Sequence, residues 1–156
     1  MSGYKLIAFD VDGTLLKSDK KASKAVIDAV DLAANKGAQI VLTTGRCVAE
    51  LDPVIKVFPH IRYAVCTSGT LIYDFRKREA ISKKSLPWHV VDMLYSAVRY
   101  KDVMVQCMSE GHTVIERRFL SQLGRYYMKP YESLYREVGT WVDDIWDYVF
   151  NSGNNV

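Results

Sequence analysis

The stretch IAFDVDGTLL, residues 7–16, decides the fold and raises the first question about function. An apolar run ends on Asp10, Asp12 follows after one residue, and Gly13 then permits a sharp turn. A short apolar run closed by a turn is typical of a buried strand, so we expect residues 4–10 to form one. Two carboxylates this close repel each other and add nothing to a core, which favours a chemical role for both.

The segments that follow alternate between helix and strand. The pattern SKAVIDAVDLAANKG predicts a helix over residues 23–37 with Ser23 as its N-cap. Residues 38–45 and 63–69 predict two more buried strands, and residues 46–58 between them predict a second, proline-interrupted helix. Strands alternating with helices in this way are typical of a parallel sheet with crossover helices.

The character of the sequence changes near the middle of the chain. Residues 86–101 predict a helix with an apolar face, and residues 102–119 predict an antiparallel hairpin. Residues 120–150 predict further short helices. We therefore expect an α/β core over residues 1–80 and a second, α+β unit over residues 81–156.

Composition and charge exclude several classes of protein. Hydrophobic residues make up 49% of the chain and charged residues 25%, which indicates a globular protein. The net charge of +3 is mild and the basic residues are interspersed, so we expect no nucleic-acid partner. The three cysteines form no C-x-x-C pair, which favours a reducing cytoplasm over a zinc site or disulfides. We also expect no signal peptide and no membrane partner, because no apolar stretch approaches the roughly 20 residues that span a bilayer.

Polar loops follow the three predicted parallel strands, at residues 10–14, 43–46 and 67–70. Ligands of open α/β sheets bind beyond the carboxyl ends of the strands, so we expect these loops to converge on one site. One carboxylate can attack as a nucleophile while its neighbour handles protons. A pair of acids also suits Mg²⁺, which prefers a few carboxylates together with water and phosphate. We therefore expect Asp10 and Asp12 to form an acid pair that also holds Mg²⁺.

The motif DVDGTLL after an apolar strand resembles the first motif of the haloacid dehalogenase superfamily in its phosphatase form. The resemblance implies that Asp10 becomes phosphorylated as the nucleophile and that Asp12 protonates the leaving group. The sequence VLTTGR resembles the second motif, in which a threonine or serine hydrogen-bonds the phosphoryl group. The resemblance assigns that role to Thr44, with Thr43 as the alternative. The same motif implies substrate-binding roles for Thr43, Gly45 and Arg46.

The sequence SGTLIYD, residues 68–74, resembles an NGALIYD-like stretch of the Cof-type phosphatases, which carry an α/β cap inserted after the third strand. The resemblance implies a Rossmann-like core with a partial cap, and substrate-binding roles for Ser68 and Gly69. Ser68 stands where that family usually has asparagine. Because the cap selects the substrate in this family, the implied ligand is a small phosphorylated metabolite, commonly a sugar phosphate.

The resemblance also implies a lysine and an acidic GDxxND-like loop after the cap, and neither occurs in this sequence. We therefore expect a truncated protein. It is either a Mg²⁺-dependent phosphatase that forms an aspartyl phosphate or a non-catalytic fragment that acts as an interaction or regulatory protein. A phosphorylated receiver domain fits worse, because receivers carry the phosphorylated Asp after a later strand.

In the implied fold the strand before Asp10 is central, with a later segment along one side. Without that segment this strand has a free apolar edge, which invites pairing with another chain. We expect a homodimer or a complementing fragment to cover it.

Overall fold

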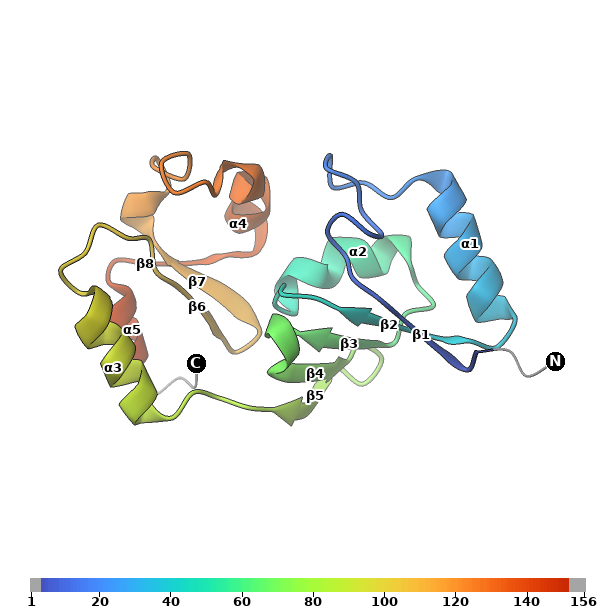
Figure 1. Cartoon of the computed structure of the whole chain (residues 1–156), viewed down its shortest axis with the longest axis horizontal. Coiled ribbons are helices and arrows are strands. Elements are labelled where there is room, and N and C mark those ends of the chain that lie inside the picture. Colours follow the sequence, from blue (N-terminus) through green and yellow to red (C-terminus); the bar gives the residue numbers. More distant parts are fainter. Residues whose placement is uncertain (1–3, 152–156) are drawn as a thin grey trace. The chain divides into compact units, whose positions relative to one another are not determined.

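A computed structural model describes residues 4–151 of the chain. The chain divides into two compact units, with the division between Lys84 and Ser85. Figure 1 shows the elements of each unit in chain order. None of the helices within residues 4–151 combines the length and the hydropathy that crossing a membrane requires.

Two successive strand–helix–strand crossovers and a hairpin build the first unit (Figure 1). Its strands run in the order β1-β2-β3-β4-β5, with β1 to β3 parallel and the last two pairings antiparallel. This confirms the expected α/β class with a parallel-rich sheet. The elements are β1 (Leu6–Phe9), α1 (Lys24–Asn35), β2 (Gln39–Thr43), η1 (Ala49–Leu51), α2 (Asp52–Val57), β3 (Tyr63–Cys66), η2 (Thr67–Gly69), β4 (Leu71–Asp74) and β5 (Glu79–Lys83).

Helices α1 and α2 pack on the same face of the sheet. Both crossovers advance in the same direction, so right-handed connections place their helices on one side. The core accordingly joins Val30 of α1 and Val54 of α2 to Ile40 and Leu42 of β2. Helix α1 begins where the sequence predicts, with Ser23 as its N-cap.

Strand β1 is an edge strand and is more exposed than a buried strand would be. It pairs with β2, and no described strand lies on its other side. Leu6 is 56% exposed, whereas Ile7 and Phe9 pack against the core. The prediction that this strand is buried is therefore wrong. A strand with one neighbour and one uncovered face keeps half of its side chains in solvent.

The second unit holds a small sheet in the order β6-β7-β8, with β6 and β7 antiparallel and β7 and β8 parallel. The predicted hairpin turn is confirmed at Glu110 and Gly111, which both have left-handed φ angles. The elements are α3 (Trp88–Val98), β6 (Gln106–Ser109), β7 (His112–Glu116), η3 (Arg117–Phe119), η4 (Lys129–Tyr131), α4 (Glu132–Val138), β8 (Thr140–Val142) and α5 (Ile145–Asn151).

Strand β8 lies where the sequence pattern predicts only helices. Gly139 ends α4 with an extended backbone, and a Cβ there would lie 2.5 Å from the carbonyl oxygen of Tyr135. The chain therefore needs glycine at this close approach. The three residues that follow are β-branched or aromatic and pair with β7. The tertiary position beside β7 thus overrides the local helical periodicity.

Candidate active site

A tight loop follows β1 and directs its polar side chains outward. Gly13 has a φ of 81°, and its N–H donates to the carbonyl of Leu16 at 2.8 Å. The N–H of Leu16 donates in turn to the carbonyl of Val11 at 2.9 Å. Three apolar side chains of the loop are buried in the core and hold it in place: Val11, Leu15 and Leu16. Asp10, Asp12 and Thr14 occupy its solvent side.

A pocket of about 360 Å³ lies at the carboxyl ends of β1, β2 and β3. The three polar loops of the sequence meet at this pocket. Six of the predicted site residues line it together with Val65: Asp10, Thr43, Thr44, Gly45, Ser68 and Gly69. Asp12 and Arg46 are not among the lining residues. The structure therefore gathers six of the eight predicted site residues around one pocket, and Arg46 joins Asp12 to its edge through Thr44.

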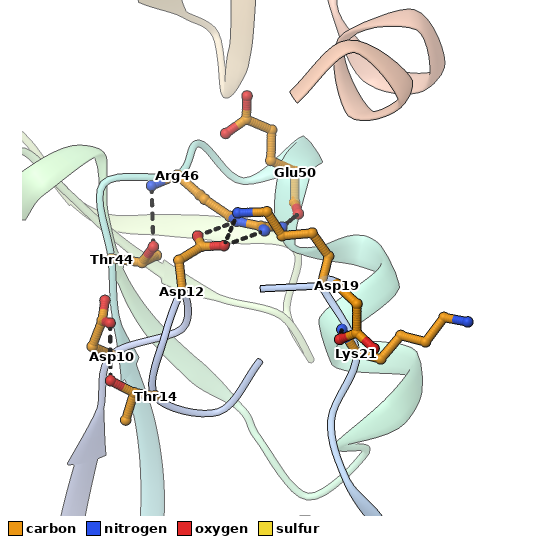
Figure 2. A network of polar contacts seen from close by, with 9 residues as sticks. Asp10, Asp12, Thr14, Asp19, Lys21, Thr44, Arg46 and Glu50 are labelled. Atoms are coloured by element: carbon orange, nitrogen blue, oxygen red, sulfur yellow. Dashed lines mark hydrogen bonds and ion pairs between the residues drawn. The ribbon is translucent and has the colours of Figure 1, made fainter. Parts of the chain in front are cut away.

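Asp10 presents its carboxylate at the end of β1. The Thr14 hydroxyl donates to its Oδ2 at 3.1 Å, as Figure 2 shows. No hydrogen bond to its Oδ1 is formed by the residues that the structure describes. Asp10 is thus an exposed carboxylate held in place on one side, with one oxygen available to a ligand.

Thr44 is held rigidly beside Asp10. Its N–H donates to the carbonyl of Val65 at 2.9 Å, and its carbonyl accepts the N–H of Ser68 at 3.1 Å. The N–H of Arg46 donates to its hydroxyl oxygen at 3.2 Å (Figure 2). Because that bond uses the oxygen as an acceptor, the hydroxyl proton can point to a ligand.

The third loop carries backbone strain. Thr67, Ser68 and Gly69 have φ angles of 51°, 52° and 101°, in the left-handed region that only glycine adopts readily. Strain of this kind is typical of functional sites, where the surrounding structure imposes it. It places the hydroxyl of Ser68 3.5 Å from the position that a Cβ of Gly45 would take.

Asp12 turns toward two cations. Arg46 donates from Nε to Oδ2 and from Nη2 to Oδ1, both at 2.8 Å, and Lys20 donates from Nζ to Oδ1 at 2.8 Å. Figure 2 shows the carboxylate directed at the Arg46 guanidinium. The Arg46 hydrogen bonds, helped by Lys20, lower the pKa of Asp12 to about 2. Asp12, Lys20 and Arg46 are hereafter the Asp12 cluster.

Lys20 and Glu50 also belong to this arrangement, and neither follows from the sequence motifs. Lys20 has a left-handed φ of 61° in a loop closed by the bond from the Lys17 N–H to the Lys21 carbonyl, 3.0 Å long. The carbonyl of Glu50 accepts from Nη1 of Arg46 at 3.1 Å and fixes the guanidinium. No sequence motif links either residue to Asp12. Lys20 reaches it through the closure of a loop, and Glu50 takes part through its backbone carbonyl, which every residue has.

The fit to a divalent cation differs between the two aspartates. The free oxygen of Asp10 suits Mg²⁺, which often takes one or two protein carboxylates and completes its shell with water and phosphate. The carboxylate of Asp12 does not suit it in this arrangement, because both oxygens already accept bonds from cations. Among residues 4–151 no group of three potential metal-ligating side chains is present.

Known proteins resemble this chain in sequence. The model of the haloacid dehalogenase-like hydrolases matches residues 7–148. The pyridoxal phosphate phosphatase YbhA of Escherichia coli (strain K12) is 27% identical over 119 residues, which cover 70% of this chain and 44% of that protein. The HMP-PP phosphatase of Klebsiella pneumoniae (strain 342) is 29% identical over 92 residues, covering 59% of this chain and 34% of that protein.

Solved structures share the fold. A haloacid dehalogenase-like hydrolase from B. subtilis matches with a TM-score of 0.78 at 18% identity, over 97% of this chain and 59% of that chain. The subclass IIB sugar phosphatase BT4131 matches with a TM-score of 0.71 at 21% identity, over 88% of this chain and 52% of that chain.

The chain spans well under two thirds of the relatives that it matches, for example 44% and 34% of the two phosphatases. The family match nevertheless covers most of this chain, including the strand, the loops and the pocket described above. The chain therefore belongs to the haloacid dehalogenase-like hydrolase family.

Proposed function

We propose that this protein hydrolyses small phosphate esters through a covalent aspartyl phosphate on Asp10. The observation that carries the proposal is the pocket that Asp10 and Thr44 line together with the small residues Gly45 and Gly69. Membership of a hydrolase family and the phosphatase names of relatives support it.

Asp10 and Thr44 perform the first step in this proposal. An oxygen of Asp10 attacks phosphorus, and the bond from phosphorus to the alcohol oxygen breaks. The Thr44 hydroxyl donates a hydrogen bond to a phosphoryl oxygen and stabilises the charge that develops there. Both groups are already fixed by hydrogen bonds, so little reorganisation accompanies the step.

Asp12 handles protons in the proposal. Its pKa of about 2 keeps it ionised at neutral pH and also makes it a weak base, so it can accept a proton from the attacking water only once its bonds to Arg46 and Lys20 loosen. To protonate a leaving alcohol it would first have to take up a proton and loosen its bonds to Arg46 and Lys20. The Asp12 cluster therefore controls when this carboxylate can act.

Mg²⁺ is the proposed cofactor and Asp10 the side chain that would hold it. Bound there, the ion would offset negative charge on the phosphoryl oxygens. The proposed substrates are sugar phosphates or other small phosphorylated metabolites, since similar proteins are named for pyridoxal phosphate, HMP-PP and sugar phosphates. Three free cysteines support a reducing, cytoplasmic setting.

Hydrolysis of p-nitrophenyl phosphate, with and without Mg²⁺, tests the proposal. We expect metal-dependent turnover that Asp10→Asn reduces at least about a thousandfold, because the variant lacks the nucleophile. Asp28→Asn removes an exposed helix carboxylate and serves as the matched control. Equal activity in Asp10→Asn and the control would contradict the proposed role of Asp10.

A non-catalytic interaction protein is the second candidate. It is favoured by the lack of a three-ligand metal cluster among the described residues and by the exposed edge of β1. A folded chain without turnover of p-nitrophenyl phosphate would favour this candidate over the phosphatase.

The edge of β1 is also proposed as the surface that receives another chain, either a second copy or a complementing fragment. Support comes from its position at the end of the sheet order and from the 56% exposure of Leu6. Unpaired strand edges with apolar side chains favour strand addition.

A further inference from the structure

The Asp12 cluster brings two cationic side chains onto one carboxylate. All three bonds measure 2.8 Å. Arg46 is firmly held, because its side chain is 9% exposed and its Nη1 also donates to the carbonyl of Glu50. The side chain of Lys20 is 35% exposed and that of Asp12 28%. Lys20 is therefore the cation of the cluster that solvent or a ligand can reach.

Lys20 occupies a backbone position that lysine adopts at a cost. Its φ of 61° lies in the left-handed region, which disfavours residues other than glycine, asparagine and aspartate by about 1–2 kcal/mol. The turn is closed by the Lys20 N–H, which donates to the carbonyl of Lys17 at 2.9 Å. The turn holds the Lys20 side chain against the carboxylate of Asp12.

The cluster adjoins the Asp10 pocket without lining it. Asp12 follows Asp10 by two residues, so their Cα atoms lie within about 7 Å of each other. Arg46 also contacts the pocket directly, through the bond from its N–H to the Thr44 hydroxyl. A small molecule with its phosphoryl group at Asp10 can thus reach the cluster with a group only a few bonds away.

We propose that Lys20 binds a second anionic group of the substrate, so that the preferred ligands are phosphate esters that carry a carboxylate or another phosphate near the phosphoryl group. The second anion takes the place of Asp12 on the Lys20 ammonium. Asp12 then keeps its two hydrogen bonds from Arg46 and loses the one from Lys20. With fewer bonds to cations, its carboxylate can take up a proton more readily. This inference extends the proposed phosphatase function by assigning its substrate class.

Binding of two matched phosphonates, in EDTA and without added metal, tests the inference by titration calorimetry. Ethylphosphonate offers the phosphonate alone, and phosphonoacetate adds a carboxylate to a skeleton of similar size. We expect phosphonoacetate to bind at least about tenfold more tightly, since a hydrogen bond between charged groups commonly contributes that much. Neither probe is hydrolysed, so the result does not depend on turnover.

Three variants assign the preference to a residue. Lys20→Met removes the ammonium, and Lys20→Asn removes it while suiting the left-handed backbone, so at least one of the two should fold. Both should reduce the ratio of affinities to about threefold or less. Lys21→Met makes the same change at the exposed neighbouring lysine and should keep the full ratio.

Two outcomes would overturn the inference. One is weak or equal binding of both phosphonates to the unchanged protein. The other is a ratio that falls equally in Lys20→Met and Lys21→Met, because that would reflect overall charge alone. A protein that prefers phosphonoacetate through Lys20 but does not hydrolyse p-nitrophenyl phosphate would support the inference and contradict the proposed catalysis.

Discussion

Ser68 lines the pocket with its backbone in the left-handed region, at φ 52° and ψ 31°. An ordinary L-residue is disfavoured there by about 1–2 kcal/mol, whereas asparagine tolerates the region. The N–H of Ser68 donates to the carbonyl of Thr44 at 3.1 Å, so the surrounding loops hold the conformation. The strained residue thus lies where the site needs two loops to meet.

Replacing Ser68 with asparagine should therefore stabilise the protein. We expect Ser68→Asn to raise the free energy of unfolding by about 0.5–1 kcal/mol, measured by urea denaturation. Ser82→Asn is the control, since Ser82 is exposed and lacks a positive φ. A Ser68→Asn variant no more stable than the control would show that the left-handed strain at Ser68 is compensated locally.

Among the strands, the end of β4 is tied to the start of β3 by an ion pair between a buried aspartate and a partly exposed arginine. Asp74 is 2% exposed, and Arg62 donates to it from Nε and from Nη2, the latter at 2.7 Å. The N–H groups of Arg76 and Lys77 donate to the same carboxylate. These bonds, those of Arg62 above all, lower the pKa of Asp74 to about 2 from its ordinary 3.8.

This pKa shift makes stability depend on acid pH. The unfolded chain binds the proton between about pH 4 and pH 2, whereas the folded chain does not, so Asp74 contributes stability above pH 4 that is lost as the pH falls to 2. We expect Asp74→Asn to unfold at lower urea concentration than the unchanged protein at pH 6 and to differ much less at pH 2.5. Asp28→Asn removes an exposed carboxylate on α1 and should show no comparable change. A constant difference across this range would contradict the assignment.

Considering the protein as a whole, the edge of β1 is the surface through which we expect it to pair with another chain. Sedimentation of the full chain tests pairing with a second copy. We expect a dimer that Leu6→Lys converts to monomer, because a charge on an exposed edge disfavours strand addition. Leu32→Lys on α1 is closely matched, since both leucines are 56% exposed. A monomeric unchanged chain would exclude the second copy and favour a complementing fragment.

Much of this protein follows from its sequence alone. The alternation of apolar runs with a capped helical pattern determined the parallel strands β1, β2 and β3, since burial on one or both faces imposes these periodicities. The polar residues directly after each strand determined which side chains would meet, because parallel strands end at the same edge of the sheet. The sequence alone thus places Asp10, Thr44 and Ser68 at the edge of the sheet where the pocket lies.

Only the tertiary structure decided how the second aspartate is used. Asp12 follows Asp10 by two residues, yet it faces Arg46 and Lys20 and does not line the pocket. The apolar pattern of β1 likewise did not predict that half of its side chains are exposed, and β8 is a strand where the local sequence predicts a helix. For Asp12 and β8 the deciding partner comes from elsewhere in the fold, whereas β1 is exposed because the described residues place a strand on only one side of it. The sequence determines which residues follow a strand, whereas the direction of a side chain depends on the charges and neighbours that folding brings beside it.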